Sequence, residues 1–397
     1  FRNPGTSLMR QRAAPPPFAL LFPLAALDAI AVGFGWLAAF SERFANWSIA
    51  DAVEWHQKEL LFGFVAAAMA GFLFTALPRW TKRPLSEGAV PAFIGMWAFA
   101  RFIPTQPWPL GLVQGMPCAL LAGVAAHHVI RANDRRNRKT IVLLALYAAA
   151  AVVCCGPFAP PSQALAAHVA VAATVALAML IGGRVLPALT ARFDMLCGEM
   201  ARPPRRRAIE PISAALAIAA LASQLLAPEA PWTPAGPFAA GAAQFLRMAS
   251  WVGRRTFETP TLVALYATYA SLPLGFILVA AHGVAPDTVP AAMAIHVWAI
   301  GGFGGMVLTI MSSMIRKRCG LAFVVSPGSE AAAALCLVAA AARAGACFWP
   351  SLFPVSAVAW TAAFVLFLYA FWTPLFEAAF RVQPVARRRT PQTESHW

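Results

Sequence analysis

Charged side chains are scarce in this sequence. Only 12% of its 397 residues are Asp, Glu, Lys or Arg, whereas 60% are hydrophobic. Soluble globular chains carry roughly 25% charged and about 45–50% apolar residues. Because a charge is costly in hydrocarbon, this depletion excludes an ordinary soluble protein and predicts a chain that lies within a lipid bilayer.

Among the charged residues, acidic ones are scarcer than basic ones. The chain has 16 Asp and Glu against 31 Lys and Arg, which gives a formal net charge of +15. Nucleic-acid binding would need a basic patch on a soluble domain. Here the basic residues lie in short clusters between apolar runs, where membrane topology places them. We therefore expect the lipid bilayer as a partner and exclude nucleic acid.

Cysteine motifs that bind metals are also lacking. The seven cysteines are scattered, mostly inside apolar runs, and no C-x-x-C or C-x-x-C-H pattern occurs. Their spacing excludes a C-x-x-C zinc site and a covalently attached c-type haem. We interpret them as small buried apolar residues, with the adjacent pair Cys154 and Cys155 as the one exception worth testing.

No polar stretch is long enough to fold as a separate domain. We expect residues 1–380 to form a single polytopic membrane domain and residues 381–397 to form a basic cytoplasmic tail. Arg10 and Arg12 precede an apolar run that is too long for the central region of a signal peptide. We therefore expect no cleavable signal.

Long hydrophobic runs fill most of the remaining sequence. Since about 20 apolar residues cross a bilayer, we predict an all-α integral membrane protein with about twelve transmembrane helices. The shortest run, 235–250, is rich in Gly and Ala, and a re-entrant segment there would reduce the count to eleven. The predicted spans are 17–40, 59–78, 88–103, 109–130, 140–157, 162–187, 208–227, 235–250, 258–281, 287–312, 327–347 and 354–380.

The distribution of Lys and Arg supports twelve spans with both termini in the cytoplasm. With an inward N-terminus, nearly all basic residues fall in inner loops or in the tail, as the positive-inside rule requires. The four that fall at outer ends are Arg43, Lys58, Arg101 and Arg343. We therefore predict a multi-pass membrane protein with both termini in the cytoplasm.

Three of the seven histidines lie near the outer ends of predicted spans. His56 lies at the mouth of span 2, and His168 and His296 lie about two turns inside spans 6 and 10. A titratable ring at this depth needs a partner, so it indicates a functional site. The alternative is that each imidazole only forms a hydrogen bond with a neighbouring helix.

These three spans are numbers 2, 6 and 10, so each follows the previous one by four positions in the order of spans. Each carries glycine after its histidine. The spacing predicts three pseudo-repeats of four helices around a centre. Haem-copper oxidases have this layout, with twelve spans and histidine ligands on helices 2, 6, 7 and 10. The likeness is one of layout and not of sequence, so it is an analogy. Span 7 here has no histidine and span 10 has only His296, which argues against a complete oxygen-reducing centre.

Specific motifs resemble the NnrS family, in order, from about residue 17 to 380. The longest begins Trp-His-Gln-Lys-Glu at Trp55 and continues to Thr81. The others are Ile-Gly-Gly-Arg-Val-Leu-Pro from Ile181, Leu-Arg-Met-Ala-Ser-Trp from Leu246, and Ile-His-Val-Trp-Ala-Ile-Gly from Ile295. The first motif is long enough to be specific, whereas the others alone would be weak.

The resemblance implies a bacterial inner-membrane protein that binds haem and copper and serves in the response to nitric oxide and nitrosative stress. Two positions depart from the family pattern. The second histidine of the first motif is Lys58 here, and the family's Gly-His-Thr-Gly run corresponds to residues 317–320, with Arg318 in the histidine position. Because cations repel copper, we expect haem to be retained and copper to be lost.

Haem needs axial ligands such as imidazole in an apolar pocket that excludes water. His56 and His296 are the predicted axial pair, with His168 as the alternative ligand at either position. Glu59 lies one turn from His56 and is predicted to orient its ring. Arg343, Arg101 or Arg43 would pair with the propionates, unless these arginines only reach toward the membrane surface.

Other residues allow two interpretations. Arg184, at the inner end of span 6, either pairs with a carboxylate or caps backbone carbonyls. Gly63 and the glycines between 301 and 305 provide either helix packing or clearance for a cofactor. No catalytic constellation is visible, so the sequence does not decide whether the protein is an enzyme.

A transporter without a cofactor is the competing function class. Prolines near span ends and glycine-broken helices suit a transport path, although a repeat every four helices disfavours the six-plus-six symmetry of inverted-repeat transporters. A third interpretation is a family member with a purely structural role, which the Lys58 and Arg318 substitutions keep open. The redox partner and the oligomeric state are not determined by the sequence.

Overall fold

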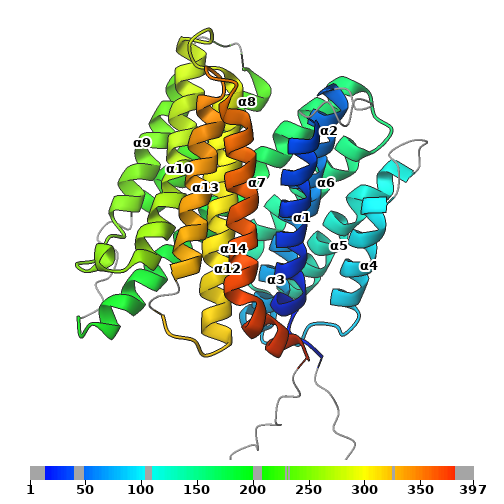
Figure 1. The fold of residues 1–397 in the computed structure, drawn as a ribbon, viewed down its shortest axis with the longest axis vertical. Coiled ribbons are helices and arrows are strands. Elements are labelled where there is room, and N and C mark those ends of the chain that lie inside the picture. The colour runs from blue at the N-terminus through cyan, green and yellow to red at the C-terminus, as the bar shows by residue number, and fades with distance from the viewer. Residues whose placement is uncertain are drawn as a thin grey trace, which may run out of the picture.

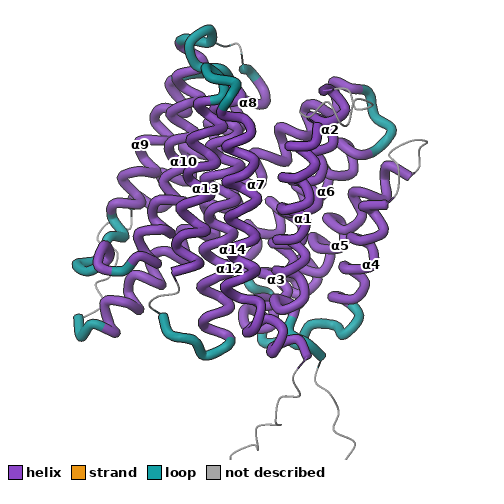
Figure 2. Tube along the Cα trace, viewed as in Figure 1, coloured by secondary structure: helices purple, strands orange, loops and turns teal. Residues whose placement is uncertain are grey.

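The computed structural model describes residues 14–39, 49–102, 110–199, 208–228, 230, 233–323 and 327–380. Over these residues the chain is helical, with no strand (Figure 2). The longer elements are α1 (Pro17–Ala39), α2 (Ile49–Lys58), α3 (Val65–Thr81), α4 (Ala89–Phe102), α5 (Leu110–Arg131), α6 (Arg138–Cys155), α7 (Pro160–Leu196), α8 (Ile209–Leu226), α9 (Ala235–Ala249), α10 (Pro260–Val284), α11 (Ala291–His296), α12 (Gly305–Arg318), α13 (Pro327–Gly345) and α14 (Leu352–Phe380).

Within the described ranges, nine helices are long and apolar enough to cross a membrane. The chain is therefore an all-α multi-pass membrane protein, as its composition predicts. The other three predicted spans correspond to α4 and α9, which have 14 and 15 residues, and to α13, which contains both Glu330 and Arg343. The total of twelve crossings stays a prediction.

Helix α7 lies between two groups of helices (Figure 1). Helices α1 to α6 lie on one side and α8 to α13 on the other, while α14 packs against both α1 and α13. α7 contacts α6 in the first group and α8, α10 and α12 in the second. The start of α1 and the end of α14 lie at the same end of the body, as an even number of crossings requires (Figure 1).

Two of the spans are interrupted by π-helical segments. The π-helix η2 (Glu59–Phe64) joins α2 to α3, and η5 (Val297–Gly304) joins α11 to α12. η2 begins three residues after His56, and η5 begins directly after His296. α7, which carries His168 and is described over its whole length, is α-helical throughout. Since π-helical turns occur frequently at functional sites, the two interrupted spans are the first place to look for one.

Hydrogen bonds and close backbone approach hold these helices together. Lipid tails are as apolar as leucine side chains, so polar links and small residues provide helix association. Trp360 on α14 donates to Ala29 O on α1 at 2.9 Å, and Tyr147 on α6 donates to Leu61 O in η2. Trp97 on α4 donates to Gly63 O in η2 at 3.0 Å. These donors hold η2 between α4 and α6.

The glycines of η5 pack against protein side chains. A Cβ at Gly301 would lie 2.5 Å from Ser271 Oγ, and one at Gly304 would lie 2.5 Å from Trp360 Cζ3. Both distances are shorter than any ordinary carbon contact, so a larger residue would force the helices apart. The sequence left these glycines open between packing and cofactor clearance, and their contacts in the structure are those of packing.

Candidate functional site

A cavity of about 340 Å³ lies where α2 and η2, α7, and α11 and η5 face one another. His56, His168, His296 and Arg343 all line it, so the structure brings together the three predicted histidine ligands and one of the arginines predicted to pair with the propionates. Most of the remaining wall is apolar and comes from α1, η2, α7, η5 and α14. These wall residues include Val32, Trp36, Leu60, Leu61, Phe64, Val65, Val171, Val175, Ile295, Ile300, Phe303 and Trp360.

Each of the three histidines is oriented by the backbone of its own helix. Nδ1 of His56 lies 3.2 Å from Ala52 O, that of His168 lies 2.8 Å from Ala164 O, and that of His296 lies 2.6 Å from Ala292 O. A carbonyl can only accept, so Nδ1 carries the proton in all three rings. Nε2 is then the nitrogen with the free lone pair, which is the form of imidazole that binds a metal.

Aromatic side chains complete the wall around these imidazoles. The ring of Trp36 on α1 lies against His56 with the centroids 4.2 Å apart. Deeper in the protein, Phe64 makes edge-to-face contacts with Trp360 at 5.5 Å and with Phe303 at 6.2 Å. Such an aromatic wall is the surface that a large flat apolar ligand needs. His168, on the α7 side of the cavity, is exposed.

Arg343 is the one fixed positive charge among the described residues that line the cavity. Its guanidinium lies 4.6 Å from the centroid of the Phe353 ring, and no carboxylate forms an ion pair with it within the described part of the chain. A cation at the wall of an apolar cavity favours a ligand with an apolar body and an anionic group.

The three histidines line the cavity from three different spans. Over the described ranges, no group of three or more His, Cys, Asp or Glu side chains is close enough to hold a metal ion directly. A bare ion would need such convergence, whereas a metal carried by a planar macrocycle needs only one or two imidazoles.

Glu59 pairs with a different partner from the one the sequence suggested. Its Oε2 lies 2.8 Å from Arg101 Nη1 on α4, and neither residue is among those that line the cavity. The side chains of Asp28, Glu59 and Arg101 all surround Gly63, and Asp28 Oδ2 is buried without a hydrogen-bond partner among the described residues. The ring of His56 is held by Ala52 O, so the structure shows no contact that supports the predicted role of Glu59. Arg101 is engaged here, and Arg43 lies outside the described residues.

Arg184 lies at the connection between α5 and α6, away from the cavity. It donates to Asn137 Oδ1 at 2.5 Å and to Arg136 O at 3.1 Å. The second contact caps a backbone carbonyl, and the first is to a side-chain amide. Replacing Arg184 with Leu should lower the free energy of unfolding by about 1–3 kcal/mol, because it leaves the buried side chain of Asn137 without this donor. Reversible unfolding in mixed micelles would measure this, and an unchanged stability would contradict the capping role.

The two positions that depart from the family pattern also lie outside the cavity lining. Lys58 Nζ lies 2.5 Å from Glu54 Oε1, one helical turn away. Arg318 at the end of α12 donates to Thr75 O on α3 at 2.9 Å and so ties these two helices together. Both cations are used in contacts with the protein itself.

A second buried network was missed by sequence reasoning. Arg247 on α9 pairs with Glu210 on α8 at 2.7 Å, and Trp251 donates to the other oxygen of Glu210 at 2.8 Å. The guanidinium also lies over the Trp251 ring, 4.7 Å from its centroid, and a Cβ at Gly183 would collide with it. The motif from Leu246 to Trp251 therefore joins α7, α8 and α9. The available signal was an Arg and a Trp four residues apart in an otherwise apolar run.

Comparison with known proteins identifies the family of the chain. A search of curated proteins found no match. The family model described as "NnrS protein" matches residues 14–378, which is nearly the whole chain. The match contains all the helices that line the histidine cavity. The chain therefore belongs to the NnrS family.

Proposed function

We propose that this protein binds haem in the histidine cavity and acts in the response to nitric oxide and nitrosative stress at the bacterial inner membrane. The observation that carries the proposal is that three imidazoles, each with Nδ1 bonded to the backbone, line one apolar cavity together with Arg343. Membership of the family supports the physiological part.

The residues present fit the chemistry of haem. His56 and His296 would hold the iron through Nε2, with His168 as the alternative ligand at either position. Arg343 would pair with a propionate, because it is the fixed cation on the cavity wall. The aromatic residues Trp36, Phe64 and Trp360 exclude water from the ring. When bound, haem would supply one-electron chemistry, and it would bind a diatomic gas on release of one of the two imidazoles from the iron.

The chain itself contributes orientation and a dry environment. The Nδ1 bonds to Ala52, Ala164 and Ala292 fix the tautomer of each imidazole, which otherwise would exchange its proton between the two nitrogens. Low polarity around a site strengthens the interaction between an axial imidazole and a metal centre and influences its redox potential. The proposal is for haem without copper, because Lys58 and Arg318 stand at two family ligand positions and are bound elsewhere.

An optical spectrum of the purified protein tests the proposal. Protein prepared from haem-replete cells should show a Soret band and about one haem per chain by pyridine haemochrome analysis. Metal analysis of the same sample should find iron and no stoichiometric copper. Protein that shows no haem absorbance would contradict the proposal and would favour the alternative, a transporter without a cofactor.

A further inference from the structure

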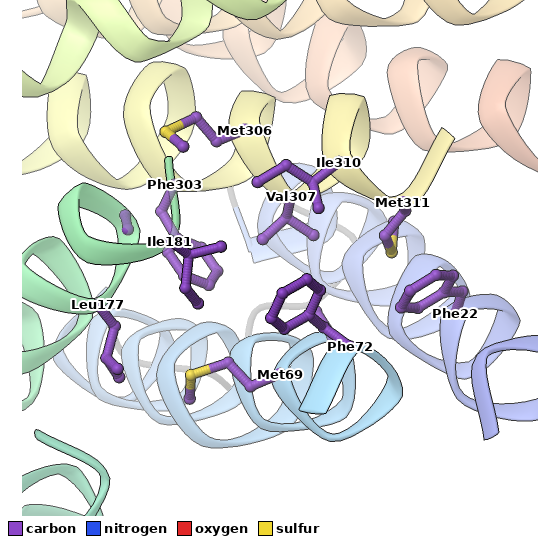
Figure 3. Close-up of a pocket in the computed structure, with 12 residues that line it drawn as sticks. Phe22, Met69, Phe72, Leu177, Ile181, Phe303, Met306, Val307, Ile310 and Met311 are labelled. Carbon is purple, nitrogen blue, oxygen red and sulfur yellow. The ribbon is translucent and has the colours of Figure 1, made fainter. Parts of the chain in front are cut away.

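A second, smaller chamber continues the histidine cavity toward the opposite end of the protein. Its volume is about 50 Å³, and its lining contains no polar side chain. Figure 3 shows its labelled side chains converging from several helices. They are Phe22 on α1, Met69 and Phe72 on α3, Leu177 and Ile181 on α7, Phe303 on η5, and Met306, Val307, Ile310 and Met311 on α12.

The chamber and the cavity lie along the same faces of the same three spans. On the second span, Phe64 and Val65 line the cavity, and Ala68 and Met69 line the chamber. On α7, Val175 lines the cavity and Ala178, about one helical turn further along, lines the chamber. Side chains three or four residues apart share a helix face. The two spaces are therefore successive parts of one seam between α3, α7 and α12.

Phe303 separates the two spaces. It lines both of them and is itself buried. Its ring makes an edge-to-face contact with Phe64, with the centroids 6.2 Å apart, and Phe64 is held in turn by Phe364 at 5.1 Å. Among the described residues, Phe303 is the one that lines both spaces, so a passage between them would run past its ring.

The chemistry of the chamber limits its occupant. Without a hydrogen-bond partner, a water molecule or an ion would lose several kcal/mol on entry. The chamber is also far smaller than engineered apolar cavities of about 150 Å³ that take up benzene. Phe72, Ile181 and Ile310 are only partly buried, so part of the chamber lining reaches the surface of the protein, which in a membrane protein faces lipid. A small neutral gas molecule satisfies all of these conditions.

We propose that the chamber takes up a small neutral gas molecule from the bilayer and passes it by Phe303 into the histidine cavity. The uptake depends on the chamber alone, whereas the delivery to an iron centre rests on the haem site proposed above. Two experiments therefore test the two parts separately.

The first experiment uses xenon as the probe of uptake. Crystals of the wild-type protein under xenon pressure should show anomalous density among Met69, Ile181 and Met306. Ala178→Leu, which fills the chamber, should remove this density. Ala176→Leu is the matched control, because Ala176 lies on the same helix and lines neither space. Ala68→Leu repeats the test from α3 if the first variant does not fold. Wild-type crystals without xenon in the chamber would overturn the uptake.

The second experiment uses carbon monoxide as the probe of delivery. After flash photolysis of the reduced CO complex, bimolecular rebinding in Ala178→Leu should be about tenfold slower, which corresponds to about 1.4 kcal/mol of barrier. Phe303→Leu should rebind faster than wild type, whereas Phe364→Leu should not, because Phe364 belongs to the aromatic cluster but lines neither space. Equal rates in all variants, or a reduced haem that does not bind CO, would overturn the delivery.

The failure of each proposal gives a different result. Protein without haem contradicts the proposed function and the delivery, while the xenon density still decides the uptake. Protein with haem and with xenon in the chamber but with unchanged rebinding shows that the gas reaches the cavity by another path, and it overturns the delivery alone.

Discussion

Replacing His296 with Ala is expected to remove most of the haem from the protein. Loss of a residue that only forms a hydrogen bond with a metal ligand already costs about 10–100-fold in metal affinity. Loss of the ligand itself should therefore lower the haem retained on purification by at least about tenfold. The same result is expected for His56→Ala. The ratio of Soret absorbance to protein absorbance, measured on purified samples, gives the haem content directly.

His282→Ala is the matched control for both variants. Its Nδ1 also lies near a backbone carbonyl, 2.7 Å from Val289 O, but it does not line the cavity. The Soret band of this variant should equal that of wild type. If His56→Ala or His296→Ala keeps a full Soret band, that histidine is not an axial ligand, and loss of the band in His168→Ala would then assign the ligand to α7.

Replacing Arg101 with Leu is expected to destabilise the fold more than any other single change considered. Arg101 and Glu59 are both largely buried, with 13% and 14% of their side-chain surface exposed, and Asp28 lies beside them at Gly63. Without the guanidinium, two buried carboxyl groups face each other with no cation. Removing one partner of a buried ion pair costs about 3–5 kcal/mol, which reversible unfolding in mixed micelles would detect.

A triple variant tests the electrostatic origin of this loss. Adding Asp28→Asn and Glu59→Gln to Arg101→Leu removes the uncompensated charge, so most of the stability should return. If the triple variant is as unstable as Arg101→Leu, the loss comes from packing and the ion-pair explanation is wrong.

Glu59→Gln alone separates the two roles considered for Glu59. If the residue orients His56, as the sequence suggested, the Soret position and the reduction potential should shift. If it serves only the ion pair with Arg101, as its 2.8 Å contact indicates, the spectrum should stay unchanged while the stability falls.

Much of the fold could be predicted from composition and loop charge. Nine predicted spans correspond to long apolar helices among the described residues, and the remaining three correspond to α4, α9 and α13. The threefold repeat is less well supported, because π-helical segments follow His56 and His296 but not His168. A π-helical turn depends on neighbouring side chains that bind its displaced carbonyls, as Tyr147 and Trp97 do here, and local sequence does not show such neighbours.

The candidate site was predicted in part for a similar reason. His56, His168, His296 and Arg343 were recognisable because polar groups are rare in apolar spans and therefore conspicuous. Trp36, Phe64 and Phe303 were not, since aromatic residues are common throughout this chain. Glu59 and Arg184 were recognised as unusual, yet Arg101, the partner of Glu59, lies on α4, and Asn137, the partner of Arg184, lies in the connection between α5 and α6.

By itself, the sequence determined three things: the chain is a membrane protein, its helices occupy certain segments, and those helices carry a few polar residues. The tertiary structure alone decided which faces of those helices meet. A span is apolar on all sides because lipid and protein interior are equally apolar, so hydrophobic periodicity does not identify the inward face. Packing brings three imidazoles and Arg343 to one cavity, turns Glu59 toward Arg101, and opens the seam that continues past Phe303.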